Sequence, residues 1–280
     1  MGINTMKKIS VRTCTIGGNA PCVLIAGPCV IESEDLTRKI AESLKEITGK
    51  LQIPFIFKAS YDKANRTSKD SYRGPGIERG LEILEKIRTE FDVPVLSDVH
   101  RFEDISKAAR VLDILQVPAF LCRQTDFVME MARTGRIINI KKGQFMSPWD
   151  MEQVVAKVTA TGNNNVMITE RGVSFGYNNL VADMRSLPLM RRGGYPVIFD
   201  ATHSVQLPGG EGLSSGGDRE MAMCLARAAA AVGIDGLFVE VHPDPDAALC
   251  DGPNSILLDT LPAFLRLFKE IDSIVKRGDL

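Results

Sequence analysis

Hydrophobic residues along the chain fall into short continuous runs, and each run is followed by a longer amphipathic stretch. The runs are Cys22–Ala26, Phe55–Lys58, Val95–Asp98, Ile114–Val117, Ile137–Lys141, Val166–Glu170, Val197–Phe199 and Gly236–Val241. Continuous apolar strands separated by helices are typical of βαβ units and a buried parallel sheet. About eight such units predict a (β/α)8 TIM barrel. No GxGxxG motif follows the first strand, which argues against an open dinucleotide-binding sheet.

Signals for the ends of helices agree with this pattern. Ser33 precedes two acidic residues, which is typical of a helix N-cap followed by a negatively charged first turn. The segment Ser147–Asp150 has a cap residue, a proline and an acid, and it predicts a second helix start. The alanine-rich stretch 222–232 is expected to be helical, and the last helix is expected from about residue 255 to residue 276.

The residues before the first run predict a small additional element. Ile9–Cys14, with the turn Gly17-Gly18-Asn19, indicates a β-hairpin over residues 8–20 or so that caps the bottom of the barrel. The sequence contains no internal repeat, low-complexity tract or linker. We therefore expect a single catalytic domain over residues 1–280.

Composition limits the classes of partner. The 280 residues carry 34 Lys and Arg against 35 Asp and Glu, so the net charge is -1, and 44% of the residues are hydrophobic. A balanced charge provides no overall attraction to nucleic acid or to an anionic membrane. No apolar run reaches the length of about 18 residues that a transmembrane helix needs. We expect neither nucleic acid nor membrane as a partner.

The cysteines and the first residues bear on localisation. The segment Met1–Arg12 has no apolar core of the kind found in signal peptides. The six cysteines are scattered without a CxxC pair, a pattern typical of reduced thiols or ligands. These features predict a cytoplasmic protein.

Charged residues follow the predicted strands at the points where the strands end, and in a TIM barrel these positions face the active site. Six of them are cations: Lys58, Lys63, Arg66, Arg123, Lys141 and Arg171. Six cations around one mouth would repel one another without anions, so the pattern predicts a ligand with more than one phosphate or carboxylate. The alternative is that each cation pairs with a neighbouring acid on a solvated surface.

A candidate metal site has four members, Cys29, His203, Glu240 and Asp251. Closure of a barrel makes the eighth strand a neighbour of the seventh and the first, so these residues could converge at one edge of the mouth. A thiolate, an imidazole and two carboxylates suit Fe2+, Zn2+ or Mn2+ better than Mg2+ or Ca2+. Taken singly, Cys29 is also typical of a buried core thiol, and His203 of a hydrogen bond to a carboxylate.

Several longer motifs carry a resemblance to a known family. They are Ala26–Ser33 (AGPCVIES), Phe57–Ser68 (FKASYDKANRTS), Gln116–Asp126 (QVPAFLCRQTD), Asn139–Gln144 (NIKKGQ), Phe199–Ser204 (FDATHS) and Glu240–Pro245 (EVHPDP). With these motifs the chain resembles the 3-deoxy-D-manno-octulosonate 8-phosphate (KDO8P) synthases, from about Val23 to the C-terminal helix. Related DAHP synthases carry a KPRTS-like loop where this chain has Lys63–Ser68, which favours the KDO8P enzymes.

The resemblance implies an aldol-type transferase of lipopolysaccharide (KDO) biosynthesis. Phosphoenolpyruvate, D-arabinose 5-phosphate and water would give KDO8P and phosphate. In this family C3 of phosphoenolpyruvate attacks the sugar aldehyde, water adds at C2, and the C–O bond is cleaved rather than the P–O bond. The two anionic substrates fit the cation cluster at the strand ends.

The resemblance also assigns residues. Those implied for phosphoenolpyruvate are Lys58, Lys63, Gln116, Lys141 and Arg171, with Arg123 on its phosphate side; those implied for the sugar phosphate are Asn65, Arg66 and Thr67. Ser60 and Phe120 are implied for substrate binding in general. Asp98 is expected near the sugar. The catalytic set is Lys141, Asp98, His203 and Asp251. The sequence does not decide between Lys141 and a metal-bound water as the acid/base partner.

The family divides into metal-dependent and metal-independent forms, with Cys or Asn after the first strand. Cys29, together with His203, Glu240 and Asp251, places this chain with the metal-dependent form, with Fe2+, Zn2+ or Mn2+ as the expected ion. The ion would orient the aldehyde or activate water. The resemblance further implies a homotetramer.

Three alternatives stay open on the sequence. The same pocket could serve a DAHP synthase that uses erythrose 4-phosphate. Lys141 or Lys58 could form a Schiff base in an aldolase, which borohydride trapping would reveal. A barrel could also serve as a phosphosugar sensor without catalysis.

Overall fold

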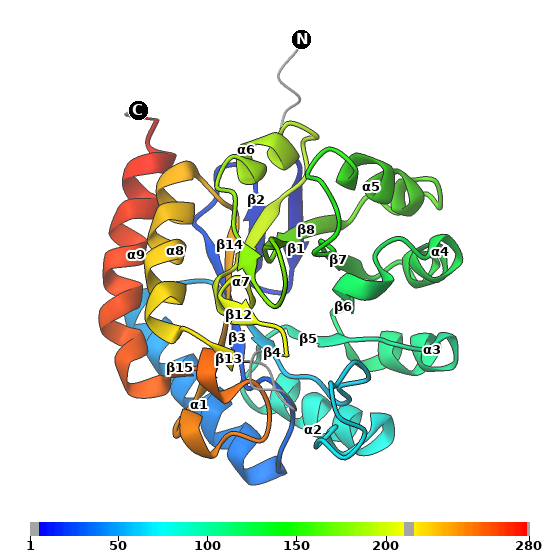
Figure 1. The fold of residues 1–280 in the computed structure, drawn as a ribbon, viewed down its shortest axis with the longest axis vertical. Coiled ribbons are helices and arrows are strands. Elements are labelled where there is room, and N and C mark those ends of the chain that lie inside the picture. Colours follow the sequence, from blue (N-terminus) through cyan, green and yellow to red (C-terminus); the bar gives the residue numbers. More distant parts are fainter. Residues whose placement is uncertain (1–5, 210–215, 279–280) are drawn as a thin grey trace.

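The computed structural model describes residues 6–209 and 216–278. Eight parallel strands of its main sheet form a ring: β3 (Val23–Gly27), β4 (Phe55–Lys58), β5 (Val95–Asp98), β6 (Ile114–Val117), β7 (Ile137–Lys141), β8 (Val166–Glu170), β11 (Val197–Asp200) and β14 (Gly236–His242). Each strand pairs with its neighbour in this order, and pairing of β14 with β11 and β3 closes the ring. The predicted TIM barrel is confirmed (Figure 1).

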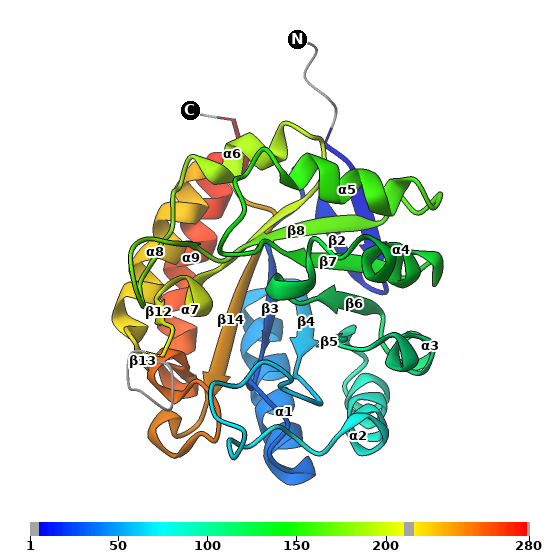
Figure 2. The ribbon, with the colours of Figure 1, turned by 45° about the vertical axis from the view of Figure 1, so that its right-hand side comes forward.

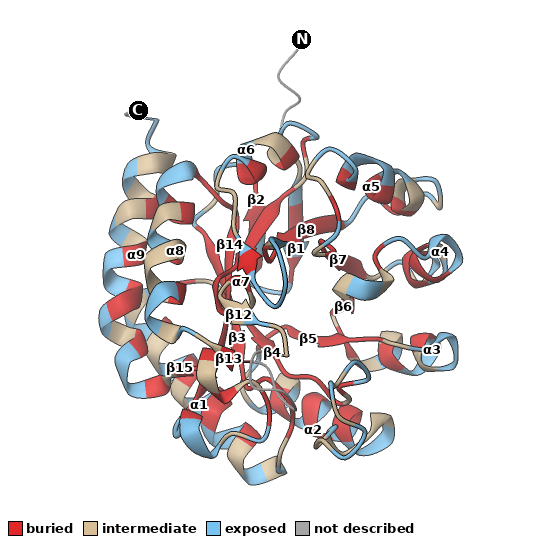
Figure 3. Cartoon of the chain, viewed as in Figure 1, coloured by how far each residue is buried: buried red, intermediate tan, exposed pale blue. Residues whose placement is uncertain are grey.

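Helices surround the strands on the outside in both views (Figures 1 and 2). They are α1 (Glu34–Leu51), α2 (Ile77–Glu90), α3 (Phe102–Val111), α4 (Thr125–Arg133), α5 (Met151–Thr159), α6 (Ser186–Arg191), α8 (Arg219–Val232) and α9 (Leu261–Lys276). Their inner sides are buried and their outer sides are exposed (Figure 3). This division follows the amphipathic pattern of the sequence.

Shorter elements lie in the connections, most of them after the carboxyl ends of strands. They are α7 (Ala201–Ser204), β9 (Val173–Ser174), β10 (Leu180–Val181), β12 (Gln206–Leu207), β13 (Gly216–Gly217), β15 (Ile256–Leu257) and the 3-10 turns η1 (Ala119–Leu121), η2 (Pro245–Ala247), η3 (Gly252–Asn254) and η4 (Leu258–Thr260). The sequence pattern predicted none of these short elements, because runs of two to four residues have no measurable periodicity.

Each barrel strand is buried on both faces. In β7, Ile138 and Ile140 pack in the large cluster that includes the helices, whereas Ile137 belongs to a second cluster. That second cluster gathers strand residues of the barrel interior, among them Ile56 and Leu96. Burial on both faces explains why the strands read as continuous apolar runs rather than as alternating ones.

An N-terminal hairpin covers the interior cluster. It consists of β1 (Lys8–Val11) and β2 (Cys14–Gly17), and Ile9 and Ile16 belong to the same cluster as the interior strand residues. The predicted hairpin is confirmed, but its predicted turn is wrong. The chain reverses at Arg12-Thr13, with Arg12 at φ 47°. Gly17-Gly18-Asn19, with φ 86°, 59° and 70°, instead redirects the chain toward β3.

The structure confirms some of the predicted helix positions and corrects others. Ser33 caps α1, because its side chain accepts a hydrogen bond from Leu36 N at 3.2 Å. The stretch 222–232 lies within α8, as predicted. The helix predicted at Ser147 begins only at Met151, because Ser147 and Asp150 bond to each other and close a separate turn first.

The start of the last helix differs from the prediction. α9 begins at Leu261 and ends at Lys276, so its end is correct and its start is about six residues late. The reason is that Ile256 of β15 pairs with Val241 of β14, which extends the sheet at this edge. Sheet pairing with a distant strand overrides a local helical preference.

Gly27 at the end of β3 allows an unusually close approach of two strands. A Cβ atom there would lie 1.9 Å from the carbonyl oxygen of Lys58, so no larger residue fits without moving the backbone. The approach brings the next turn over β4, where Lys58 Nζ donates to the carbonyl oxygen of Cys29 at 2.9 Å. Gly27 therefore places the first strand's end directly at the barrel mouth.

Candidate active site

Polar side chains form the layer of the barrel interior at the carboxyl ends of the strands. Lys58, Asp98, Gln116, Lys141, Asp200 and Glu240 each come from a different strand, and all are buried. Two adjoining pockets open above this layer. The inner pocket is lined by Lys58, Lys63, Asn65, Asp98, His100, Gln116, Pro118, Ala119, Lys141, Arg171 and His203. The outer pocket is lined by Lys63, Asn65, Arg66, Thr67, Phe120, Gln144, Arg171, His203, Gln206, Pro208, Gly209, Cys250 and Asp251.

Four of the six predicted cations converge in the inner pocket. Lys58, Lys63, Lys141 and Arg171 are no more than 8% exposed. Buried carboxylates balance part of this charge. Glu240 Oε1 lies 2.6 Å from Lys58 Nζ and 3.7 Å from Lys63 Nζ, and Asp200 pairs with Lys141. The cations are therefore not on a solvated surface, and the surface alternative is wrong for these four.

Charged neighbours keep the buried carboxyl groups ionised. Burial by itself would raise the pKa of Glu240, but Lys58, His203 and Lys63 outweigh it and hold that pKa well below its ordinary value. The pKa of Asp98 is likewise lowered, since Lys58, Lys63 and His100 outweigh its burial. Both groups are therefore hydrogen-bond acceptors in the site.

Lys141 is in the opposite situation. Burial lowers its pKa, Arg171 and Lys58 lower it further, and the pairing with Asp200 only partly opposes them. A lysine with a lowered pKa can exchange a proton more readily than an exposed one. Lys141 lines the inner pocket, so its ammonium group is available to a bound substrate.

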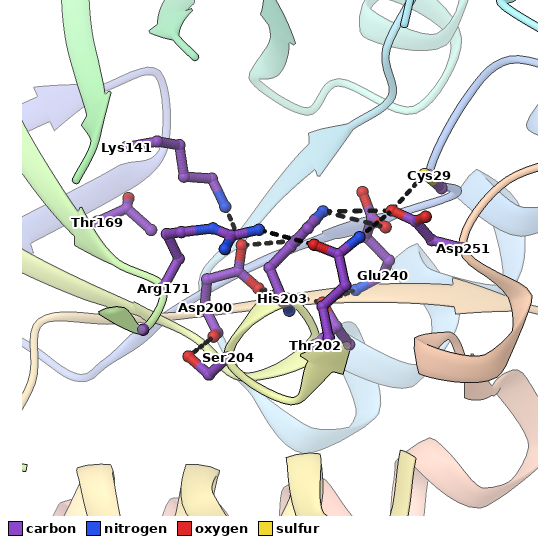
Figure 4. Close-up of polar contacts among 12 residues, drawn as sticks. Cys29, Lys141, Thr169, Arg171, Asp200, Thr202, His203, Ser204, Glu240 and Asp251 are labelled. Carbon is purple, nitrogen blue, oxygen red and sulfur yellow. Dashed lines mark hydrogen bonds and ion pairs between the residues drawn. The ribbon is translucent and has the colours of Figure 1, made fainter. Parts of the chain in front are cut away.

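Asp200 organises the end of β11. Its side chain accepts from His203 N at 2.9 Å and so caps the short helix α7, and its backbone oxygen accepts from Ser204 Oγ at 2.6 Å. The cap places His203 one turn beyond the strand. The ring atom Nδ1 lies 2.7 Å from Asp200 Oδ2, outside hydrogen-bond alignment. In Figure 4 Lys141 reaches Asp200 from one end of the row, and Asp251 and Cys29 lie at the other.

The four predicted metal ligands lie close together at the edge formed by β11, β14 and β3. His203 Nε2 is 3.7 Å from both Glu240 Oε2 and Asp251 Oδ2. Cys29 Sγ is 3.6 Å from Asp251 Oδ2. Two sets of donor atoms, one of Cys29, Cys250 and Asp251 and one of His203, Glu240 and Asp251, each lie within 4.8 Å of one another.

An observation on Glu240 tests whether a cation fits there. Its Oε2 is buried and has no hydrogen-bond partner among the described residues, although its Oε1 is bonded to Lys58. An ionised buried oxygen without a partner is costly, and a cation would satisfy it. The donor set therefore fits a divalent metal ion.

The loop that carries Asp251 is held by its backbone. Asp251 has a left-handed conformation, φ 49°, and its carbonyl oxygen accepts from Asn254 N and Ser255 N. Leu249 N donates to Glu32 Oε1 at 2.9 Å, which ties the loop to the turn after β3.

The predicted sugar-phosphate residues gather in the outer pocket. Asn65, Arg66 and Thr67 all line it, as does Phe120, which was predicted for substrate binding in general. Arg66 Nη1 donates to Cys250 Sγ at 2.7 Å and lies 3.9 Å from Asp251. Ser60, also predicted for substrate binding, lines neither pocket. It is fully buried and donates to Asp98 Oδ2 at 2.5 Å.

Arg123 does not join the other predicted residues. It is exposed, lines neither pocket, and uses its backbone oxygen to accept from Lys157 Nζ. Its position on the connection from η1 to α4 places it at the outer rim of the mouth. Arg123 therefore lies outside both of the pockets that the described residues of this chain form.

Three site residues were missed by sequence reasoning. Asp200 directly follows a predicted strand and lies three residues before His203, and Cys250 directly precedes Asp251, so position along the chain could have indicated both. Cys250 Sγ lies 2.9 Å from Cys29 Sγ, and both thiols are free. Gln206, which accepts from Arg171 Nη2 at 2.9 Å, had no signal in the sequence.

The fold and the site define a (β/α)8-barrel enzyme with a strongly cationic inner pocket. The chain belongs to the DAHP synthetase I family, whose model matches residues 4–277. It is 64% identical over 271 residues to the 2-dehydro-3-deoxyphosphooctonate aldolase of Geotalea daltonii, which covers 97% of this chain and 100% of the relative. The aldolase of the same name from Geobacter sulfurreducens is 62% identical over 96% of this chain and 99% of its own length.

A third relative of that name, from Trichlorobacter lovleyi, is 60% identical over 96% of this chain and 99% of its own length. The resemblance stated from the motifs is thus confirmed at the level of the family. None of the described helices is long and apolar enough to cross a membrane.

Proposed function

We propose that the protein is a KDO8P synthase, which condenses phosphoenolpyruvate with D-arabinose 5-phosphate and water to give KDO8P and phosphate. 2-Dehydro-3-deoxyphosphooctonate is the same product under another name, so the relatives at 60–64% identity support this reaction. The observation that carries the proposal is the convergence of Lys58, Lys63, Lys141 and Arg171 in one pocket. Comparison of phosphate release with arabinose 5-phosphate and with erythrose 4-phosphate tests it.

Phosphoenolpyruvate would occupy the inner pocket. Lys58, Lys63, Lys141 and Arg171 supply charge for its carboxylate and phosphate, and Gln116 supplies an amide. Arg171 can offer a planar pair of donors, whereas the lysines act as point charges. The low dielectric of this buried pocket strengthens each of these contacts.

The sugar phosphate would occupy the outer pocket. Asn65, Arg66 and Thr67 belong to one loop after β4 and would bind the phosphate end, with Phe120 against the carbon chain. The two pockets share Lys63, Asn65, Arg171 and His203, so the aldehyde end would lie next to the inner pocket. Asp98, an ionised acceptor buried at the inner pocket, would bind a sugar hydroxyl.

Lys141 is the residue that we assign to proton transfer. Its lowered pKa and its place in the inner pocket suit the donation of a proton to the aldehyde oxygen of the sugar as the new C–C bond forms. Asp200 holds its ammonium group in place. Lys58 is less suited to a Schiff base, because its Nζ is bonded to Glu240 and to the backbone at Cys29.

We further propose that Cys29, His203, Glu240 and Asp251 hold a divalent metal ion, Fe2+, Zn2+ or Mn2+. Such an ion would polarise the aldehyde or lower the pKa of a water molecule. Asp200, beside the His203 ring, would orient that ring toward the ion, as carboxylates commonly do for histidine ligands.

Removal of the metal tests this site. EDTA should abolish most of the activity, and added Mn2+, Fe2+ or Zn2+ should restore it. Cys29→Asn should weaken the affinity for the ion, measured by metal analysis of the purified variant. Full activity in protein shown to be free of metal would contradict the metal proposal and leave the proposed reaction standing.

We also propose a cytoplasmic homotetramer. Exposed aromatic residues support an interface near the mouth: Phe120, Phe145, Trp149, Phe175 and Tyr177 are 53–98% exposed. They belong to the connections that follow β6, β7 and β8, which are neighbours in the barrel. Large exposed apolar side chains grouped on one rim are typical of contact surfaces.

One observation favours an alternative activity, that of a DAHP synthase. The family model is named for DAHP synthetases, which would use erythrose 4-phosphate. The inner pocket would serve either enzyme, because both share phosphoenolpyruvate. The outer pocket decides between the sugars, and the relatives favour the longer one.

A further inference from the structure

A chain of hydrogen bonds crosses four neighbouring strands beneath the inner pocket. Thr169 Oγ1 of β8 donates to Asn139 Oδ1 of β7 at 2.6 Å, and Asn139 Nδ2 donates to Gln116 Oε1 of β6 at 2.7 Å. Gln116 Nε2 then donates to Asp98 Oδ1 of β5. We call Thr169, Asn139, Gln116 and Asp98 the amide chain. All four residues are buried, and Thr169 and Asn139 are fully buried.

The direction of every bond in the amide chain follows from its last member. Asp98 is held ionised by Lys58, Lys63 and His100, and an ionised carboxylate only accepts. The amide end of Gln116 that faces it must therefore be the NH2 group. The oxygen of Gln116 is then turned to Asn139, which must present its own NH2 group. The oxygen of Asn139 is left for the Thr169 hydroxyl.

The direction of these hydrogen bonds determines which polar group of Gln116 faces the inner pocket. Gln116 lines the inner pocket, whereas Asn139 and Thr169 line neither pocket. One N–H of Gln116 is used on Asp98, and no other described residue accepts the second. The Gln116 oxygen is occupied by Asn139 and cannot turn outward. Gln116 thus presents a donor to the pocket, beside the ammonium groups of Lys58 and Lys141.

A donor at this position matches an anion. The opposite orientation of the amide would direct a carbonyl oxygen at a carboxylate or phosphate oxygen, which is repulsive. It would also place the Gln116 oxygen against Asp98 Oδ1 and the Gln116 NH2 group against the NH2 group of Asn139, which leaves buried polar groups unpaired. A single amide flip would therefore change both the fold's hydrogen bonding and the recognition of the substrate.

We propose that Asn139 and Thr169 are positioning residues, which act through Gln116 to fix an amide donor for phosphoenolpyruvate. The inference rests on the assignment of the inner pocket to phosphoenolpyruvate. Asn139 and Thr169 do not touch the substrate. Their effect is on the affinity for phosphoenolpyruvate and not on the affinity for the sugar phosphate.

A double-mutant cycle tests the proposal through the binding of phosphoenolpyruvate alone. Gln116→Leu, Asn139→Leu and the double variant leave the net charge unchanged. The dissociation constant is measured by calorimetric titration without sugar phosphate. Each single variant should raise it about tenfold, the loss expected when a buried partner is removed.

The coupling is the decisive result. The double variant should bind phosphoenolpyruvate no more weakly than Gln116→Leu, because Asn139 acts only through Gln116. Additive losses would overturn the proposal, since Asn139 would then act independently of Gln116. If Gln116→Leu binds normally, the assignment of the inner pocket fails and the inference fails with it. Normal binding by Asn139→Leu, with weak binding by Gln116→Leu, overturns the inference alone.

Thr169 provides a matched pair that keeps the shape of the barrel interior. Thr169→Val removes the hydroxyl and should raise the dissociation constant for phosphoenolpyruvate about threefold. This loss of affinity is smaller because the lost hydrogen bond is one step further from Gln116. Thr169→Ser keeps the hydroxyl and should restore binding to within twofold of the unaltered protein. The KM for arabinose 5-phosphate should change less than twofold in both.

The two Thr169 variants also test the positioning role if Asn139→Leu does not fold. Thr169→Val that binds phosphoenolpyruvate as the unaltered protein does would overturn the proposal. Equal losses for both substrates would overturn it as well, because they would indicate a general disturbance of the barrel. Selective loss in Thr169→Val with recovery in Thr169→Ser would support it.

Discussion

Lys141 shows how single side chains acquire their chemistry in this molecule. Sequence reasoning placed it at a strand end facing the mouth, and the structure confirms that position. Its partner Asp200 lies on β11, two strands away in the barrel order, and the two side chains pair in the barrel interior. A strand-end position can thus be predicted from periodicity, whereas a pairing across the barrel cannot.

Substitution of Lys141 tests its role in proton transfer. Lys141→Met should lower kcat by about 100-fold or more, since general acid–base groups contribute about 10²–10⁴. Steady-state release of phosphate measures the effect. Lys141→Arg is the control that keeps the charge but cannot lose its proton, so it should fail nearly as badly. Activity of Lys141→Met within twofold of the unaltered protein would contradict the assigned role.

Asp98 carries a prediction about pH. Its pKa is lower in the folded protein than the value of about 3.9 in an unfolded chain. Such a group contributes stability that is present above pH 4 or so and is lost as the pH falls through the folded-state pKa. Acid titration of the unfolding free energy should therefore be shallower for Asp98→Asn below pH 4. Parallel curves for the two proteins would contradict the low pKa.

At the scale of elements, the strands were the best predicted part. Seven of the eight predicted runs match their strands or fall one residue short at one end, because burial on both faces gives a continuous apolar pattern. The predictions failed where pairing or packing with a segment distant in sequence determines the local structure. The start of α9 depends on the pairing of β15 with β14, and the hairpin turn depends on the packing of β1 and β2 beneath the barrel.

The hairpin gives a prediction about stability. Ile16 is fully buried in the interior cluster, so Ile16→Ala should lower the free energy of unfolding by about 2–4 kcal/mol. Thr15→Ala is the control, because Thr15 is the exposed neighbour on the same strand. Chemical denaturation measures both. The kcat of folded Ile16→Ala should be unchanged, and a loss of stability equal to that of Thr15→Ala would contradict the capping role.

At the scale of the whole molecule, closure of the ring assembles the site. Cys29, His203 and Glu240 come from the first, seventh and eighth barrel strands or the turns that follow them, and pairing of β14 with β11 and β3 brings them to one edge. This convergence was predicted from the order of strands. The place of Arg123 at the rim was not, because nothing in the sequence tells a pocket residue from one that lies outside the pocket of a single chain.

The exposed aromatic rim carries a prediction about assembly. The protein should be a homotetramer by light scattering, and Trp149→Glu should shift it to smaller species, because Trp149 is 68% exposed on this rim. Ile274→Glu is the control, since Ile274 is an exposed apolar residue on α9. A monomeric unaltered protein, or equal effects of the two variants, would contradict this surface as the interface.

The choice of sugar phosphate tests the central claim most directly. Purified protein supplied with phosphoenolpyruvate and a divalent metal should release phosphate far faster with arabinose 5-phosphate than with erythrose 4-phosphate, and mass analysis of the product should give KDO8P. A preference for erythrose 4-phosphate would identify a DAHP synthase and contradict the account. Absence of phosphate release with either sugar would contradict it as well.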